Sequence, residues 1–158
     1  MTPEERAALV ARYRAGYAAF AAAVADAGHA GLDRAAEGGW TGRQVVHHLA
    51  DSELTSAVRL RRLLAEDAPE IVGYDEARFA DVLHYDRPVA AALRAVEAAR
   101  ETSAELLDRL TEEDWRRTGT HTESGAYGVE VWLRTYADHP YDHTRQLRRA
   151  AGVEATAG

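Results

Sequence analysis

Histidines are the side chains best suited to chemistry in this chain, which has seven of them and no cysteine. His139 and His143 stand four positions apart in the stretch HPYDH, inside a predicted helix. Residues at this spacing lie on one face of a helix, so both imidazoles can point at one spot. Because imidazole nitrogen is a common ligand of divalent metals, the pair predicts two ligands to one metal ion.

The third ligand has to come from another helix, and the adjacent pair His47 and His48 in VVHHLADSE is the natural candidate. Successive residues step by about 100° around a helix, so the two imidazoles face different sides. His48 shares its side with the polar residues Asp51 and Arg59, which suits a cavity wall. His47 shares its side with Leu54 as well as with arginines. We therefore expect His48 to be the ligand and His47 to be packed or supporting.

Three histidines from two helices would leave a coordination position open, which is typical of catalytic rather than structural metal sites. Asp51, one turn after His48, could then orient that imidazole or a bound water. Zinc, nickel, cobalt and iron all accept imidazole ligands, and the order of affinities does not choose among them. A bundle can also hold several buried, hydrogen-bonded histidines with no metal, and the spacing leaves that alternative open.

The other three histidines fall in predicted loops beside polar residues. Exposure to solvent is the simplest expectation for His29, His84 and His121.

The hydrophobic pattern predicts an all-α protein, a four-helix bundle. The long helices are expected over residues 3–28, 41–65, 88–110 and 129–151, with short extra helices over 76–83 and 112–115. Capping boxes at Thr2 and Thr41 mark the first two starts. Residues 118–128 are expected to form a loop, with a small hairpin as the alternative. Pro140 interrupts the last helix, so the helix should either kink there or begin near it.

Length and composition bound the remaining possibilities. The 158 residues suit one domain, expected over 1–151, followed by a frayed tail over 152–158. No apolar run approaches the roughly 18 residues that span a bilayer, so no membrane association is expected. The start, MTPEERAALV, lacks the order of a signal peptide, which predicts a cytoplasmic protein.

A net charge of −7 argues against a nucleic-acid partner. All cationic side chains are arginine, which excludes lysine chemistry.

Two longer stretches resemble a known family. GGWTGRQVVHHLADSE followed by RLRRLLAEDAPEIVGYDE is similar to the DinB-like superfamily, and more closely to its YfiT branch of metal-dependent hydrolases and bacillithiol transferases. The shared features, over roughly residues 35 to 150, are a Trp opening the second helix, the HHLADS run, an Arg-rich turn, Y-D-E after a proline loop, and a closing H-x-x-x-H pair. Here they fall on Trp40, His47 to Ser52, Arg59, Pro69, Tyr74 to Glu76, and His139 with His143.

The resemblance implies a four-helix bundle with a three-histidine metal site, which maps onto His48, His139 and His143. It also implies zinc or nickel as the metal, a homodimer, and a low-molecular-weight thiol such as bacillithiol as a co-substrate. This chain departs from the branch pattern at Pro140, after the first ligand of the pair. It also has Asp142 where the branch has another histidine beside the second ligand.

These observations lead to a hypothesis of a metal-dependent enzyme that acts on small electrophilic substrates as a thiol S-transferase or a hydrolase. Asp51 is a candidate base or orienting group, and Arg59 a candidate partner for a carboxylate. One alternative for Arg59 is a surface arginine with a solvated head. The alternatives for the whole protein are a non-catalytic, stress-related metal-binding or dimerisation module and a thiol-dependent isomerase.

Overall fold

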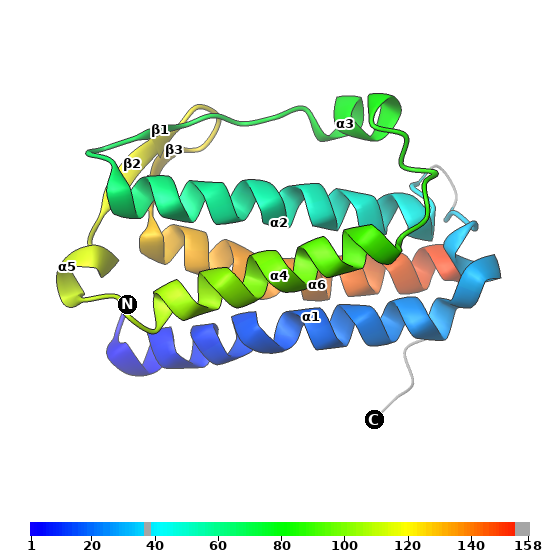
Figure 1. Cartoon of the computed structure of the whole chain (residues 1–158), viewed down its shortest axis with the longest axis horizontal. Coiled ribbons are helices and arrows are strands. Elements are labelled where there is room, and N and C mark those ends of the chain that lie inside the picture. Colours follow the sequence, from blue (N-terminus) through cyan, green and yellow to red (C-terminus); the bar gives the residue numbers. More distant parts are fainter. Residues whose placement is uncertain (37–38, 154–158) are drawn as a thin grey trace.

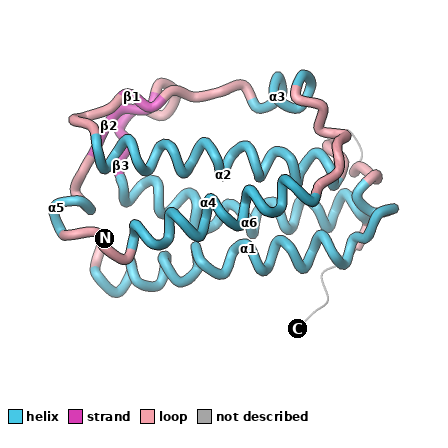
Figure 2. The backbone as a smooth tube through the Cα atoms, viewed as in Figure 1, coloured by secondary structure: helices cyan, strands magenta, loops and turns pink. Residues whose placement is uncertain are grey.

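The computed structural model describes residues 1–36 and 39–153, and most of them are helical (Figures 1 and 2). The elements in chain order are α1 (Pro3–Leu32), α2 (Gly42–Ala65), β1 (Glu70–Ile71), α3 (Glu76–Val82), α4 (Ala90–Leu107), α5 (Glu112–Trp115), β2 (Thr118–His121), β3 (Gly125–Gly128) and α6 (Val129–Ala151). The long helices α1, α2, α4 and α6 pack side by side, which confirms the predicted four-helix bundle (Figure 1).

The start of α2 is fixed by local chemistry, as the sequence predicts. The Thr41 hydroxyl accepts a hydrogen bond from the Gln44 amide at 3.1 Å, and the Gln44 side chain accepts one from the Thr41 amide at 2.9 Å. A reciprocal pair of this kind satisfies two amides that have no partner inside the helix. Because the first turn is fixed, the directions in which His47 and His48 point are fixed as well.

Two helix boundaries differ from the prediction. Gly28 has φ +60° and ψ −179° and breaks the regular helix, but another turn follows, so α1 continues to Leu32. The third long helix, predicted over 88–110, spans only Ala90–Leu107. Pro88 therefore lies before the first turn of α4 and is not part of the helix. Its missing N–H and its ring disturb no hydrogen bond inside the helix at that position.

The segment over 118–128 is a hairpin, not the loop that the polar composition favoured. β2 pairs antiparallel with β3, with Thr118 opposite Gly128, and β1 pairs parallel with β2. Each strand of the hairpin is only four residues long, and glycines remove much of the usual strand signal. His121, expected to be exposed, is buried in this sheet and its Nδ1 accepts a hydrogen bond from the Glu123 amide.

The helices α2 and α4 run in the same direction, so the chain has to cross back along the bundle between them (Figure 1). This crossover, residues 66–89, contains β1 and α3 and extends along α2. Two residues of α2 hold its far end. The His47 Nε2–H donates to the Arg87 carbonyl at 3.0 Å, and the Tyr85 hydroxyl donates to the Asp51 carboxylate at 2.6 Å.

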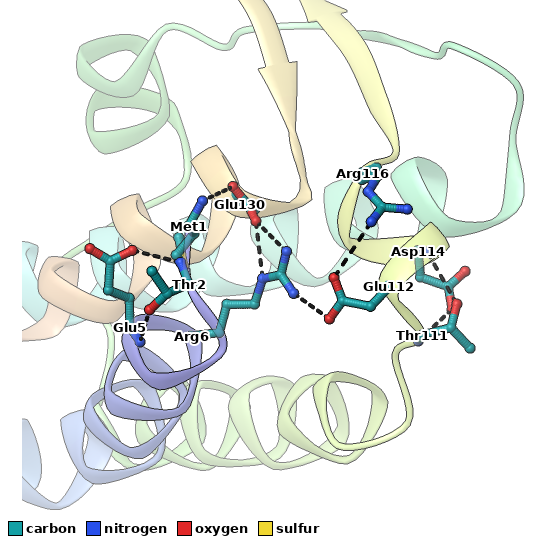
Figure 3. Close-up of polar contacts among 9 residues, drawn as sticks. All are labelled: Met1, Thr2, Glu5, Arg6, Thr111, Glu112, Asp114, Arg116 and Glu130. Carbon is teal, nitrogen blue, oxygen red and sulfur yellow. Dashed lines mark hydrogen bonds and ion pairs between the residues drawn. The ribbon is translucent and has the colours of Figure 1, made fainter.

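Ion pairs tie together the end of the bundle where the chain starts (Figure 3). The Arg6 guanidinium in α1 donates to Glu130 at the start of α6 and to Glu112 at the start of α5. The amino group of Met1 lies 3.2 Å from the same Glu130 carboxylate. Behind them Tyr13 and Trp132 pack with ring centroids 5.3 Å apart.

At the other end, Gly152 takes the left-handed conformation with φ +69° and ends α6. Residues 154–158, most of the tail expected to fray, lie outside the described residues, as do residues 37–38 of the loop before α2. Among the helices that are described, none combines the length and the apolar character needed to cross a membrane.

Candidate metal centre

Three imidazoles from two helices meet inside the bundle. His48 comes from α2, and His139 and His143 come from α6. Each offers a ring nitrogen, and these nitrogens lie within 4.8 Å of one another. Within residues 1–36 and 39–153, the group has these three members and no carboxylate. The structure thus brings together the three histidines that the sequence singles out.

Burial keeps these imidazoles neutral. His48 is 2% exposed, and burial lowers its pKa to about 4. Burial, followed by the nearby charge of His143, lowers the pKa of His139 to about 2. Burial and then the charge of His48 lower the pKa of His143 to about 4. Since metals bind the unprotonated nitrogen, all three side chains are in the form that binds metal at neutral pH.

Gln146 sets the tautomer of His143. Its side-chain oxygen lies 2.7 Å from His143 Nδ1, so this nitrogen carries the proton and donates it. His143 Nε2 is therefore left with a free lone pair, directed at His139 Nε2 3.0 Å away. An outer hydrogen bond of this kind is typical of metal-binding histidines. Gln146 has no role in the predicted site, although its position three residues after His143 places it on the same helix face.

Two ring nitrogens at the site have no hydrogen-bond partner among the described residues. They are the buried Nδ1 atoms of His48 and His139. Leaving a buried polar atom unsatisfied costs about 1 to 3 kcal/mol, so such atoms need an explanation. The fit to a metal rests on the other observation, that each of the three imidazoles offers one nitrogen to a common point. Three convergent imidazole nitrogens are a donor set that fits a divalent metal of the zinc or nickel type.

Two further side chains flank His48. The indole of Trp40, in the residue before the cap of α2, packs against the imidazole with ring centroids 4.9 Å apart. The carboxylate of Glu76, at the start of α3, lies 4.0 Å from His48 Nε2. Glu76 belongs to the Y-D-E motif, but residue type and spacing gave it no place at the site. Its proximity to His48 results from the path of the crossover.

The two residues predicted to act beside the metal contact different partners. Asp51 accepts the hydrogen bond from Tyr85 and lines a groove with His47 and Arg87. Arg59 donates to the Tyr136 hydroxyl at 3.1 Å and to a main-chain carbonyl of the crossover at 3.0 Å. The ring of Tyr136 lies 5.7 Å from that of His139. Arg59 thus reaches the neighbourhood of the histidines through Tyr136.

Comparison with known proteins identifies the family. The sequence pattern that defines the DinB superfamily matches residues 12–147, most of the chain. The chain belongs to the DinB superfamily. This confirms the resemblance that the HHLADS run and the H-x-x-x-H pair indicated.

Relatives within the DinB superfamily agree with this assignment. A protein of Oceanobacillus iheyensis, named "putative metal-dependent hydrolase", is 37% identical over 110 residues, which are 70% of this chain and 64% of that protein. A protein of the same name from Halalkalibacterium halodurans is 30% identical over 114 residues, covering 72% of this chain and 67% of its own length. The chain thus spans less than two thirds of the length of the Oceanobacillus relative.

A solved DinB-like structure has the same fold. YfiT from Bacillus subtilis superposes with a TM-score of 0.88 at 28% identity, covering 98% of this chain and 91% of YfiT. It is described as "a probable metal-dependent hydrolase with an unusual four-helix bundle topology".

The lowered histidine pKa values predict how the metal-free protein responds to acid. An unfolded histidine titrates near 6.5, so below that pH the unfolded chain binds protons that the folded site does not. We expect the free energy of unfolding to fall as the pH drops from about 6.5 towards 4, by at most about 1.4 kcal/mol per pH unit and histidine. Urea unfolding with a chelator present, at pH 5, 6 and 7, measures this slope. His139→Gln should make it shallower, and an unchanged slope would contradict the assignment.

Gln146 predicts a separate effect on metal affinity. Gln146→Leu removes the acceptor that holds the proton on His143 Nδ1, so Nε2 is free to carry the proton instead. Loss of an outer-shell partner weakens metal binding by about 10- to 100-fold, and we expect the lower part of that range. Competition with a chromophoric chelator measures the affinity. Arg149→Gln, on the exposed face of the same helix, is the control and should bind like the parent protein.

Proposed function

We propose that this protein is a metal-dependent enzyme in which His48, His139 and His143 hold a divalent metal and a small electrophilic substrate is attacked beside it. The single observation that carries the proposal is the convergence of imidazole nitrogens from one buried and two half-buried histidines within 4.8 Å, with no fourth ligand in the group among the described residues. Three protein ligands leave room for a water, a thiol or a substrate, which is the arrangement of catalytic sites.

A divalent metal in this site would supply Lewis-acid chemistry, lowering the pKa of a bound water or thiol so that a nucleophile is available near neutral pH. The chain itself supplies the surroundings. Trp40 and the buried side of α2 exclude solvent from His48. Glu76 Oε2, 4.0 Å from His48 Nε2 and more than half exposed, is placed to accept a hydrogen bond from a nucleophile entering beside His48.

Arg59 is the proposed binding group for an anionic substrate or thiol. Its guanidinium is half-buried, its Nε is buried without a partner among the described residues, and its two hydrogen bonds go to uncharged oxygens. A carboxylate would be a stronger acceptor than either of them because it is charged. Asp51, predicted as a base or an orienting group, accepts a hydrogen bond from Tyr85, which favours a positioning role at the crossover for this residue.

Hydrolysis is the reaction that the names of the relatives favour, with water as the nucleophile. Transfer of a low-molecular-weight thiol such as bacillithiol is the second candidate, and the cationic Arg59 near the histidines supports it because such thiols carry carboxylates. Both reactions need the same metal site. The homodimer, the single domain over 1–151 and the cytoplasmic location stay predictions.

Metal content tests the site directly. The parent protein purified from cells supplied with zinc and nickel should contain about one equivalent of metal per chain, whereas His48→Ala and His143→Ala should lose most of it, since two imidazoles bind far more weakly than three. Elemental analysis measures the content, and circular dichroism checks that the variants are folded. Equal metal in all three proteins would refute the site.

Activity separates the two reactions. The metal-loaded protein should cleave a p-nitrophenyl ester or join a thiol to 1-chloro-2,4-dinitrobenzene, and the chelated protein should do neither. Metal-dependent turnover that needs an added thiol favours transfer, and turnover without one favours hydrolysis. A metal-loaded protein without turnover on either substrate class would favour a non-catalytic metal-binding module.

The role of Arg59 predicts a selective loss. A hydrogen bond to a charged group contributes about 1.5 to 3 kcal/mol, so Arg59→Gln should raise the KM for a carboxylate-bearing substrate or thiol by about 10- to 100-fold. The KM for a neutral analogue should change little. Arg61→Gln, an exposed arginine two positions on, is the matched control. Equal losses for charged and neutral substrates would show that Arg59 acts through the fold rather than on the charge.

A further inference from the structure

A buried arginine in one bundle helix joins the other three. Arg100 in α4 is 2% exposed. Its Nη1 donates to the Glu53 carboxylate in α2 and, at 3.2 Å, to the Tyr136 carbonyl in α6. Its Nη2 donates to the Tyr13 carbonyl in α1. Glu53 is fully buried, so this pair has almost no contact with solvent and no role in the proposed chemistry.

One of these acceptors, the Tyr136 carbonyl, lacks its usual hydrogen bond inside the helix. In a regular helix the carbonyl of Tyr136 would bond the amide of residue 140, four positions on. Residue 140 is a proline, which has no N–H and whose ring pushes that carbonyl aside. Arg100 donates to this carbonyl. The guanidinium therefore supplies the hydrogen bond that Pro140 removes, and α6 continues through Pro140 from Val129 to Ala151, instead of beginning there.

The surrounding backbone leaves space for this arrangement. Gly16 in α1 faces the point where Pro140 and Arg100 meet, and a Cβ on Gly16 would lie 2.5 Å from Pro140 Cγ and 2.9 Å from Arg100 Nη2. Any larger residue would force these groups apart. The Arg100 guanidinium also stacks on the Tyr13 ring, 3.8 Å from its centroid. The side chains of Arg100, Pro140 and Tyr13 therefore pack closely together, and only a residue without a side chain fits at position 16.

We propose that Arg100 is a positioning residue of the metal centre. Pro140 lies between the two ligands of α6, directly after His139 and three residues before His143. The hydrogen bond from Arg100 sets the backbone of the turn that carries both imidazoles, and the bond to Glu53 ties that turn to α2, which carries His48. This inference rests on the proposed metal site and adds a residue that does not touch the metal.

If Arg100 only stabilised the fold, it would not need hydrogen bonds to three other helices. Buried ion pairs can often be replaced by apolar residues of similar size at little cost to stability, so the Glu53–Arg100 pair alone does not explain the three-way contact. The hydrogen bond to Tyr136 matters only because residue 140 is a proline. The effect of Arg100 on metal binding should therefore depend on which residue stands at position 140.

A double-mutant cycle tests this dependence. Arg100→Lys keeps a cation beside Glu53, but one ammonium lacks the planar fork that reaches three helices. In the parent background we expect zinc to bind about 10-fold more weakly, as for loss of an outer-shell partner. Pro140→Ala restores the amide, so in that background the same change should cost less than about 3-fold. Chelator competition measures zinc affinity, and the absorption spectrum of bound Co²⁺ reports the ligand geometry in each protein.

Two controls keep the cycle decisive. Arg117→Lys alters another arginine that donates to main-chain carbonyls, those of Leu63 and Glu66, away from the histidines, and should change neither zinc affinity nor the Co²⁺ spectrum. If Arg100→Lys fails to fold, the apolar pair Glu53→Leu with Arg100→Met takes its place in both backgrounds, with the same expected pattern.

The outcomes separate this inference from the proposed function. Suppose that the parent protein binds zinc. An equal loss of affinity in the parent and Pro140→Ala backgrounds, or no loss in either, would then overturn the role of Arg100 and leave the metal site standing. Failure of the parent protein to bind zinc, Co²⁺ or nickel would overturn the proposed function and this inference with it.

Discussion

One buried charged pair, Glu53 and Arg100, is the point at which side-chain hydrogen bonds join all four long helices of the bundle. Removing two ions from water costs several kcal/mol for each, and this is offset only when the geometry is good and the remaining donors find partners. Arg100 meets part of that requirement by reaching carbonyls in α1 and α6 as well as the carboxylate in α2. Its Nε and the second oxygen of Glu53 stay buried without a partner among the described residues, so part of the cost is not offset. The same contacts join α4 to α2 and α6, the two helices that carry His48, His139 and His143.

The adjacent histidines of α2 have different positions and partners. His48 points into the bundle, whereas His47 points to the crossover, where it donates to the Arg87 carbonyl and its Nδ1 lies 3.4 Å from the Arg87 guanidinium. A bundle whose second and third long helices are parallel needs such a crossover, and its path places Glu76 beside His48. One imidazole of the doublet therefore belongs to the site, while the other anchors the segment that covers it.

Much of this could be predicted from the sequence because the signals are local. The 100° step around a helix and the polar residues beside His48 favoured His48 over His47, and the four-residue spacing paired His139 with His143. The structure brings these three imidazoles together. The contributions of Gln146, Glu76 and Arg100 were missed for different reasons. The role of Gln146 can be recognised only when one asks which nitrogen of His143 carries the proton. Glu76 and Arg100 contact their partners across long sequence separations. Beside Pro140, the Tyr136 carbonyl accepts a hydrogen bond from Arg100, which lies 40 residues before the proline in the sequence.

The two ends of the bundle differ in how well their polar groups are satisfied. Where the chain starts, the Arg6 guanidinium pairs with the carboxylates of Glu130 and Glu112 (Figure 3). Around the histidines, by contrast, two ring nitrogens lack partners among the described residues, and the imidazoles are held unprotonated. The buried nitrogens without partners lower the stability of the metal-free protein, and the unprotonated imidazoles lower it further below about pH 6.5, where the unfolded chain binds protons. The contacts at the start of the chain offset part of this cost.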